Sequence, residues 1–437
     1  MKLTSSYAVQ LKNIDFNIMD TVKVYREAVA FCINAFNKEW KTISLIKGEH
    51  ERFNFAEKLV HTTKSNKATY DFDAEFYKFP SYLRRSVIQT ALGCVSSYQS
   101  NLQNWKLNPV GKEPTLTYDR MLMPTFYNKN MYLTSDNPYE CRIKVYLNRD
   151  WVWKTVKFVK TDVKYIEKHL KDLSPSAPVL EKRFGTYYLR FAFDEFVSLN
   201  NTELSNRTIC SVDLGLNSDA VCTIMNSVGT VCARKFINFA YEKDQLWHLC
   251  NRIKKQQRKY GPQSVKRKWS YAKYLNQELS VKIAAAIVAF AKLHQVDTIV
   301  FEHLNMQSKK SRGKYAQRLH LWRKNGIQQI AQHKAHKNGI RISRICAKNT
   351  SALAYDGSDL VVRNANNKAL ATFQNNKQYN CDLSASYNIG ARYFIRELLK
   401  PIGVTQWSQI LAKVPELERR TSCTYHTLIE LNKVLAA

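Results

Sequence analysis

The sequence predicts a multidomain protein of mixed α/β and α+β architecture. Its 437 residues are enough for roughly two to four domains with hydrophobic cores. In the first half, segments with apolar residues at helical spacing are followed by segments in which apolar and polar residues alternate, as in half-buried strands. In the second half, short apolar segments alternate with amphipathic ones, which is typical of a sheet with crossover helices.

The first half is expected to combine a β-barrel-like unit with inserted helices. One helix is predicted to begin with Asp20 as its N-cap, and a second one begins at Ser81. Alternating apolar residues predict strands at 143–147 and 189–193. The predicted boundaries are 1–19 and 125–200 for the β-barrel unit and 20–124 for the helical insertion.

The second half is expected to form one sheet with helices around it. A basic, largely helical stretch is predicted at 252–268, interrupted at Gly261 and Pro262. Further helices are expected at about 318–336 and from Asp382 onward. Apolar segments predict strands at 209–212, 220–225, 230–234, 298–301 and 341–345.

The composition narrows the classes of function. Lys and Arg number 67 against 36 Asp and Glu, so the formal net charge is +31, while hydrophobic residues make up 45% of the chain. This apolar content excludes a disordered basic protein, and a folded protein with so much positive charge is expected to bind nucleic acid. No apolar segment is long enough to span a membrane, and residues 1–20 lack the apolar core of a signal peptide. We therefore expect a cytoplasmic protein without membrane contacts.

Three carboxylates stand at the ends of apolar elements. Asp213 and Glu302 each follow a predicted strand, and Asp382 begins a predicted helix. Each of them alone is also explained as a helix cap or a turn residue. Together they suit metal chemistry, because two divalent ions about 3.5–4 Å apart need several carboxylate oxygens. In this interpretation Asp213, Glu302 and Asp382 are both catalytic residues and ligands of two Mg²⁺ or Mn²⁺ ions.

The segments around these acids resemble the motifs of a nuclease family. Residues 211–217 (SVDLGLN), 298–305 (TIVFEHLN) and 382–389 (DLSASYNI) resemble, in this order, the three RuvC motifs of the transposon-encoded TnpB nucleases and of the related compact type V CRISPR effectors. The basic helix after the first motif and the Thr350-Ser351 pair are also similar to the family. The resemblance implies an RNase H-like RuvC nuclease domain at 207–345 and 382–437. It also implies that the β-barrel unit is a wedge domain and the helical insertion a recognition lobe.

The sequence departs from the family between residues 346 and 381. Family members have two C-x-x-C pairs there that bind zinc, but this chain has Ala354, Gly357, Ala371 and Gln374 at about those positions. These residues supply no thiolate, so we expect no structural zinc. The segment is expected to be a degenerate zinc-ribbon-like insertion. Its predicted apolar contacts come from Leu353, Tyr355, Leu360, Leu370 and Phe373.

Two groups of basic residues are candidates for nucleic-acid binding. Residues 251–273 contain no Asp or Glu, so the bases there lack acidic partners within the helix. The alternative interpretation is a solvated helix face without a ligand. In the first half, nearby aromatic residues are either core residues or base-stacking residues. The predicted contacts are Arg252, Lys254, Lys255, Arg258, Lys259, Lys266, Arg267 and Lys268 in the second half, and Lys78, Arg84 and Arg85 in the first.

The resemblance implies an RNA-guided DNA endonuclease. Such a protein recognises a short flanking motif, pairs its guide with the target and cuts DNA by two-metal phosphodiester hydrolysis in a single RuvC-like site. The expected partners are guide RNA and target DNA, with the protein as a monomer in the RNA complex. Two alternatives remain open: an RNA-guided DNA-binding regulator with little or no cleavage, and, less favoured, a DNA-strand transferase that uses the same carboxylates.

Overall fold

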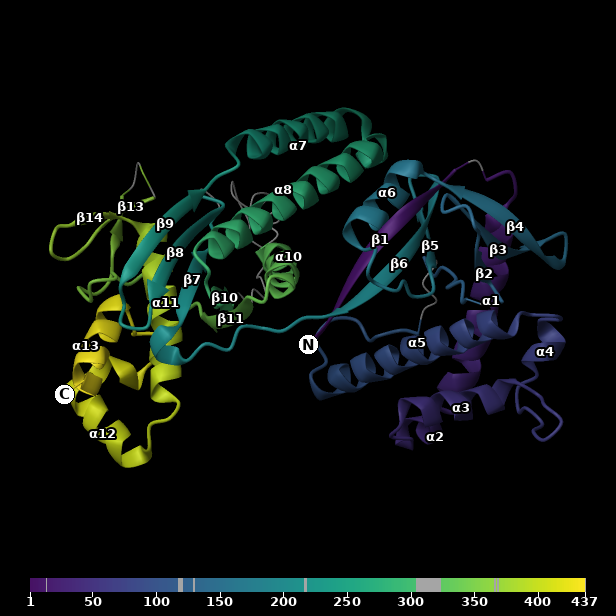
Figure 1. Ribbon diagram of the computed structural model, residues 1–437, viewed down its shortest axis with the longest axis horizontal. Coiled ribbons are helices and arrows are strands. Elements are labelled where there is room, and N and C mark those ends of the chain that lie inside the picture. Colours follow the sequence, from purple (N-terminus) through teal and green to yellow (C-terminus); the bar gives the residue numbers. More distant parts are fainter. Residues whose placement is uncertain are drawn as a thin grey trace. The chain divides into compact units, whose positions relative to one another are not determined.

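The computed structural model describes residues 1–436 except 13, 117–120, 129, 216–217, 304–323, 365–366 and 368. The chain forms two compact units, Lys2–Glu195 and Phe196–Ala437, the latter joined by Met1 (Figure 1). Helices and sheets occur in both units, which confirms the predicted mixed α/β, multidomain fold class. Leu216, Asn217, Leu304, Asn305 and the first residues of the helix predicted at 318–336 lie outside the described residues.

The N-terminal unit is built on a six-stranded sheet with the order β2-β3-β4-β1-β6-β5. Both predicted strands are present, within β3 and β6. Thr125 pairs with Val179 of β5, and Asn128 pairs with Tyr132 of β2, so residues 125–128 connect the two edges of the sheet. The strands are β1 (Lys2–Lys12), β2 (Tyr132–Thr134), β3 (Glu140–Leu147), β4 (Asp150–Phe158), β5 (Val179–Arg183) and β6 (Thr186–Phe196).

Helices of the same unit share one hydrophobic core with this sheet. The second predicted helix begins at Ser81 as expected, but the first begins at Ile18 and its N-cap is Asn17, whose side chain accepts a hydrogen bond from the Met19 amide. Asp20 lies in the first turn instead, where its negative charge favours the helix dipole. The helices are α1 (Ile18–Lys38), α2 (Trp40–Leu45), α3 (Glu49–Val60), α4 (Phe72–Glu75), α5 (Ser81–Leu107) and α6 (Lys160–His169).

The C-terminal unit contains a five-stranded sheet with the order β11-β10-β7-β8-β9. The three strands β7, β10 and β11 run parallel, whereas β8 pairs antiparallel with both β7 and β9. All five predicted strands of the second half are confirmed. They are β7 (Thr208–Asp213), β8 (Ala220–Asn226), β9 (Val231–Ile237), β10 (Thr298–His303) and β11 (Arg341–Cys346).

Helices cover both faces of this sheet (Figure 1). Cys210 and Val212 pack against α8 and α10 on one face, and Ile209 packs against α11 on the other. The predicted break at Gly261 is confirmed: α7 ends at Tyr260, and Gly261 has φ +79°, which favours glycine. The helices are α7 (Ala240–Tyr260), α8 (Lys266–Leu293), α10 (Lys324–Lys337), α11 (Cys381–Leu399), α12 (Val404–Lys413) and α13 (Tyr425–Ala436), with 3₁₀ turns η1 (Leu204–Asn206), η2 (Pro262–Val265) and η3 (Pro415–Glu418).

The insertion between β11 and α11 contains a small three-stranded sheet, β12 (Val362–Arg363), β13 (Leu370–Thr372) and β14 (Gln378–Asn380). Its apolar core includes Phe373, which is 2% exposed, together with Ala354 and Ala371. These two alanines therefore fill core positions where the family resemblance places cysteines. The prediction that Leu360 holds this insertion together is wrong, because its side chain is 57% exposed.

None of the helices in the described part of the chain is long and apolar enough to cross a membrane.

Replacing Phe373 with Ala is expected to lower the free energy of unfolding of the insertion by about 3–5 kcal/mol, because it removes a fully buried ring. Hydrogen exchange of the amides of β13 and β14 measures this loss, with Leu360→Ala as the exposed control. A zinc chelator is expected to leave the wild-type melting temperature unchanged. A chelator-induced decrease would contradict the interpretation that side-chain packing holds this insertion.

Candidate active site

The pairing of two parallel strands brings Asp213 and Glu302 side by side. Ile209 is the register partner of Thr298, and Val212 is the partner of Phe301, so the next step of the register places Asp213 beside Glu302 at the carboxyl ends of β7 and β10. Because side chains alternate along a strand, both acids point to the sheet face that α11 covers. Their side chains are largely buried, with 9% of Asp213 and 8% of Glu302 exposed.

The third acid reaches the same place from the start of α11. The helix begins at Cys381 and is capped by Asn380, whose side chain accepts a hydrogen bond of 2.9 Å from the Leu383 amide, so Asp382 lies in the first turn. A Cβ atom at Gly215 would be 3.7 Å from Asp382 Oδ2 but only 2.7 Å from the Ser218 carbonyl oxygen. The Ser218 carbonyl oxygen therefore leaves no room for a Cβ atom at this position, and the loop after β7 passes close to Asp382.

Burial and the neighbouring carboxylates raise the proton affinity of Asp213. The pKa of Asp213 lies well above its usual range, chiefly because of burial and then because of the nearby Glu302 and Asp382 carboxylates. Burial also raises the pKa of Asp382. The Arg363 guanidinium opposes both increases. The positive charge of Arg363 thus only partly balances the negative charge of the buried carboxylates. A bound cation would stabilise their ionised forms.

The chemistry of this donor set fits a hard divalent cation, because such ions prefer carboxylate oxygens. Within the residues that the structure describes, however, no three His, Cys, Asp or Glu side chains are positioned to share one ion. Instead, Glu302 Oε1 accepts a hydrogen bond from the Thr350 hydroxyl. A shared ion therefore requires the carboxylate groups to turn toward one another from this arrangement.

Two buried side chains of α11 hold the loop that carries Thr350. Asn388 Nδ2 donates hydrogen bonds of 3.0 Å to the carbonyl oxygens of Thr350 and Leu353, while its Oδ1 accepts from the Tyr425 amide. One turn later, Arg392 is 6% exposed. These two residues connect the Glu302 environment to the C-terminal segment of the chain.

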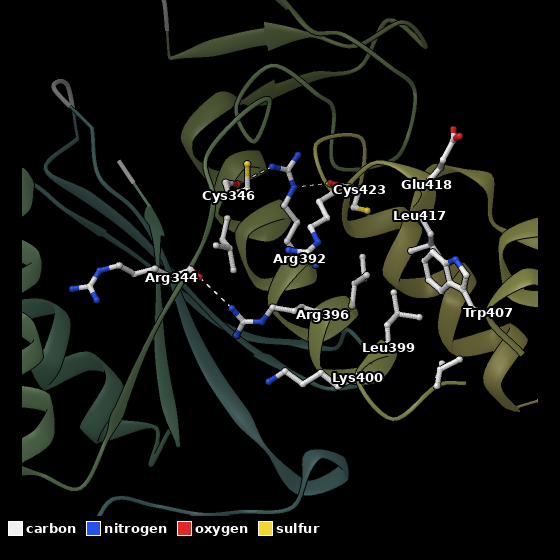
Figure 2. A pocket seen from close by; sticks show the side chains of 14 residues that line it. Arg344, Cys346, Arg392, Arg396, Leu399, Lys400, Trp407, Leu417, Glu418 and Cys423 are labelled. Carbon is white, nitrogen blue, oxygen red and sulfur yellow. Dashed lines mark hydrogen bonds between the residues drawn. The ribbon is translucent and has the colours of Figure 1, made fainter. Parts of the chain in front are cut away.

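Figure 2 shows Arg392 and its hydrogen bonds to Cys346 and Cys423 in a pocket of about 610 Å³ that lies along the edge strand β11. Its guanidinium donates to the carbonyl oxygens of Cys346, Lys348, Thr421 and Cys423, at 2.7–3.0 Å. The neighbouring Arg396 donates to the Arg344 carbonyl oxygen. These two buried or half-buried arginines are thus used to hold the protein backbone.

Sequence reasoning missed Thr350, Arg363, Asn388 and Arg392 as parts of the site. The signals available were weak: Thr350 precedes the insertion, and Asn388 and Arg392 are one helical turn apart on α11. Arg363 belongs to β12 and is exposed, so no periodicity marks it. All four act through contacts between segments that are distant in the sequence.

The predicted basic residues of the second half are on the surface of α7 and α8. All eight of them are exposed, and among the described residues none forms an ion pair with a carboxylate. In the first half, Lys78 and Arg85 are exposed and lie against the rings of Tyr77 and Phe53. The prediction for Arg84 is wrong: it is 7% exposed and donates a hydrogen bond of 2.9 Å to Asp73. A side chain that is buried in this way cannot contact a nucleic-acid backbone.

Comparisons with known proteins agree on the fold. Residues 4–147 match the sequence profile of the Aq_aa04 family. No curated protein matches the chain. The solved structure of the "mini-RNA-guided endonuclease CRISPR-Cas_phi3" is similar with a TM-score of 0.54 at 11% identity, over 89% of this chain and 92% of that one. A Cas12f1-sgRNA-target DNA complex is similar with a TM-score of 0.46 at 14% identity, over 81% of this chain and 91% of that one. The chain thus shares the fold of that endonuclease structure.

Replacing Arg392 with Ala is expected to lower the free energy of unfolding by at least about 3 kcal/mol, because four carbonyl oxygens lose their donor in a buried site. Urea unfolding of the whole chain measures the change. The control is Lys400→Ala, which removes an ion pair of a 62% exposed side chain and should cost less than about 1 kcal/mol. Equal effects of the two substitutions would refute a structural role specific to Arg392.

Proposed function

We propose that this protein is an RNA-guided DNA endonuclease. The observation that carries the proposal is the convergence of Asp213, Glu302 and Asp382 at one end of the sheet, in a chain whose net charge is +31. A cluster of buried acids has no evident structural value in a basic protein, and its repulsion is offset when cations bind. The fold shared with a solved mini-RNA-guided endonuclease supports the same reading.

Each part of the proposed site has a physical task. Asp213, Glu302 and Asp382 would hold two Mg²⁺ or Mn²⁺ ions, which supply an activated water and stabilise the leaving oxygen of a phosphodiester. Thr350 orients Glu302, and Asn388 holds the backbone of Thr350. Arg363 provides positive charge beside the acids, where a phosphate of the bound strand would lie. The exposed bases of α7 and α8 would bind the backbone of guide RNA or of the guide–target hybrid.

A second candidate is an RNA-guided DNA-binding regulator without cleavage. It is favoured by one observation: among the described residues, the acids are not arranged to share an ion. One measurement distinguishes the two candidates. Both would bind guide RNA and matched DNA, but only the endonuclease would cut the DNA in the presence of Mg²⁺.

Replacing Asp213 with Asn is expected to abolish Mg²⁺-dependent cleavage of guide-matched plasmid DNA while leaving RNA and DNA binding intact, because only a ligand carboxylate is lost. Plasmid cleavage and filter binding with the copurified RNA measure the two properties. The control is Asp359→Asn, an exposed acid of the insertion, which should cut like the wild type. Cleavage by the Asp213 variant would disprove the site. Binding by a wild-type protein that does not cut would establish the regulator instead.

Replacing Arg363 with Gln is expected to tighten Mn²⁺ binding about fivefold, because removal of a nearby positive charge is worth ~1 kcal/mol to a cation. Titration calorimetry of the protein–RNA complex measures this affinity. The control is Lys377→Gln, which removes a cation of the same insertion that instead contacts the Tyr355 hydroxyl at 2.7 Å. An unchanged or weaker Mn²⁺ affinity in the Arg363 variant would contradict the proposed closeness of Arg363 to the ion site.

A further inference from the structure

The helices α7 and α8 expose aromatic rings among their basic side chains. The exposed fractions are 72% for Tyr241, 45% for Trp247, 63% for Tyr260, 55% for Tyr271 and 62% for Tyr274. Rings scattered singly are normal, whereas exposed rings that gather on one surface can mark a binding site. Combined with unpaired cations, they are typical of surfaces that bind unpaired nucleic-acid strands by stacking and by phosphate contacts.

Two neighbouring cavities lie on these helices, one lined partly by aromatic rings and the other mainly by basic side chains. The first, which we call the ring cavity, has a volume of about 340 Å³ and is lined by Tyr241, Gln245, Arg252 and Tyr271 among others, with Asp244 as its one carboxylate. The second, the phosphate cavity, has a volume of about 680 Å³ and is lined by His248, Asn251, Arg252, Lys254, Lys255 and Arg258. His248 and Arg252 line both cavities, so the two are adjacent along α7.

The helix geometry explains why the cavities lie side by side. Tyr241, Gln245, His248 and Arg252 follow one another at intervals of three or four residues and therefore form one stripe of α7, and Asn251, Lys255 and Arg258 form the adjacent stripe. Beneath them, Leu246, Cys250 and Ile253 pack into a small core with Val265 and Ala272. The rings and cations are thus presented by a rigid two-helix support.

The dimensions favour a strand over a free nucleotide. The ring cavity is lined by α7 from Tyr241 to Arg252, and eleven steps of 1.5 Å correspond to about 16 Å. Successive nucleotides of one strand are about 3.4 Å apart when stacked. More than one nucleotide therefore fits along this surface.

We propose that the ring and phosphate cavities of α7 and α8 bind a short unpaired segment of a nucleic-acid strand. Its bases stack on Tyr241 and Tyr271, and its phosphates contact Arg252, Lys255 and Arg258. The phosphates of a duplex, including a guide–target hybrid, can meet the cations, but its base faces are covered by neighbouring base pairs and leave the rings without partners. An acidic peptide would meet the cations but would leave the rings without planar partners. The proposal deepens the proposed function and rests on it, since it assigns an unpaired segment of guide or target to this surface.

The test measures how the purified full-length protein binds a fluorescein-labelled 12-nucleotide oligothymidine, with oligouridine to compare DNA and RNA. An abasic 12-mer with the same phosphates is the matched probe. We expect the wild type to bind the abasic strand and a 12-base-pair duplex at least about tenfold more weakly than oligothymidine, because stacking contributes roughly 1–3 kcal/mol per base. Equal affinity for the abasic strand or the duplex, or displacement by poly-glutamate as effectively as by oligothymidine, would overturn the proposal.

Substitutions in α7 and α8 test which residues are responsible for oligothymidine binding. The double substitution Tyr241→Leu and Tyr271→Leu should weaken oligothymidine binding about tenfold and leave the dependence on salt unchanged, because no charge is lost. Lys255→Gln should instead reduce the salt slope by about 1. Tyr274→Leu is the control, because this exposed tyrosine of α8 lines neither cavity. An effect of Tyr274→Leu as large as that of the double substitution would refute the assignment.

The outcome is separable from that of the proposed function. Oligonucleotide binding requires no catalysis, so base-dependent binding by a protein that never cuts guide-matched DNA would refute only the endonuclease. Guided cleavage by a protein that binds abasic and normal strands equally would refute only the stacking site.

Discussion

The register between β7 and β10 is the constraint on which the rest of the C-terminal unit depends. A shift by one residue would turn Asp213 or Glu302 to the opposite face, where α8 and α10 form an apolar core. The register is fixed by Ile209 and Val300, which pack under α11, and by their neighbours Cys210 and Ile299 on the other face. Hydrophobic alternation thus determines where the two acids point, and α11 adds the third.

Hydrogen bonds from side chains of α11 to backbone carbonyl oxygens position the loop beside Glu302. Neither Thr350 nor the loop around it belongs to a regular element, so its position depends on Asn388 and Arg392 rather than on strand pairing. Both side chains are buried, where donors and acceptors without partners are costly. The polar interior of α11 is therefore part of the geometry around Glu302 and also joins it to the segment around Thr421 and Cys423.

Strand positions follow from the sequence, because periodicity and strand ends depend on local residues. The meeting of the three acids was expected from metal chemistry and from the family resemblance, since it depends on strand pairing between distant segments. The features that the sequence could not reveal depend on tertiary contacts. Arg84 looks like a surface base until Asp73 is found beside it, and Leu360 looks like a core residue although its side chain faces solvent. At α1, Asn17 rather than the predicted Asp20 is the N-cap, because the helix begins earlier, at Ile18. The role of Arg363 could not be predicted from the sequence either, because only folding brings β12 near the acids.

The small sheet of the insertion has a consequence for the conditions that the protein tolerates. Ala354, Ala371, Cys381 and the ring of Phe373 fill its interior, and Tyr355, Tyr379 and Tyr387 contact one another beside it. Thiolate ligands can lose their metal to a competitor, whereas packed side chains have no metal to lose. The strand that carries Arg363 should therefore keep its place through metal starvation.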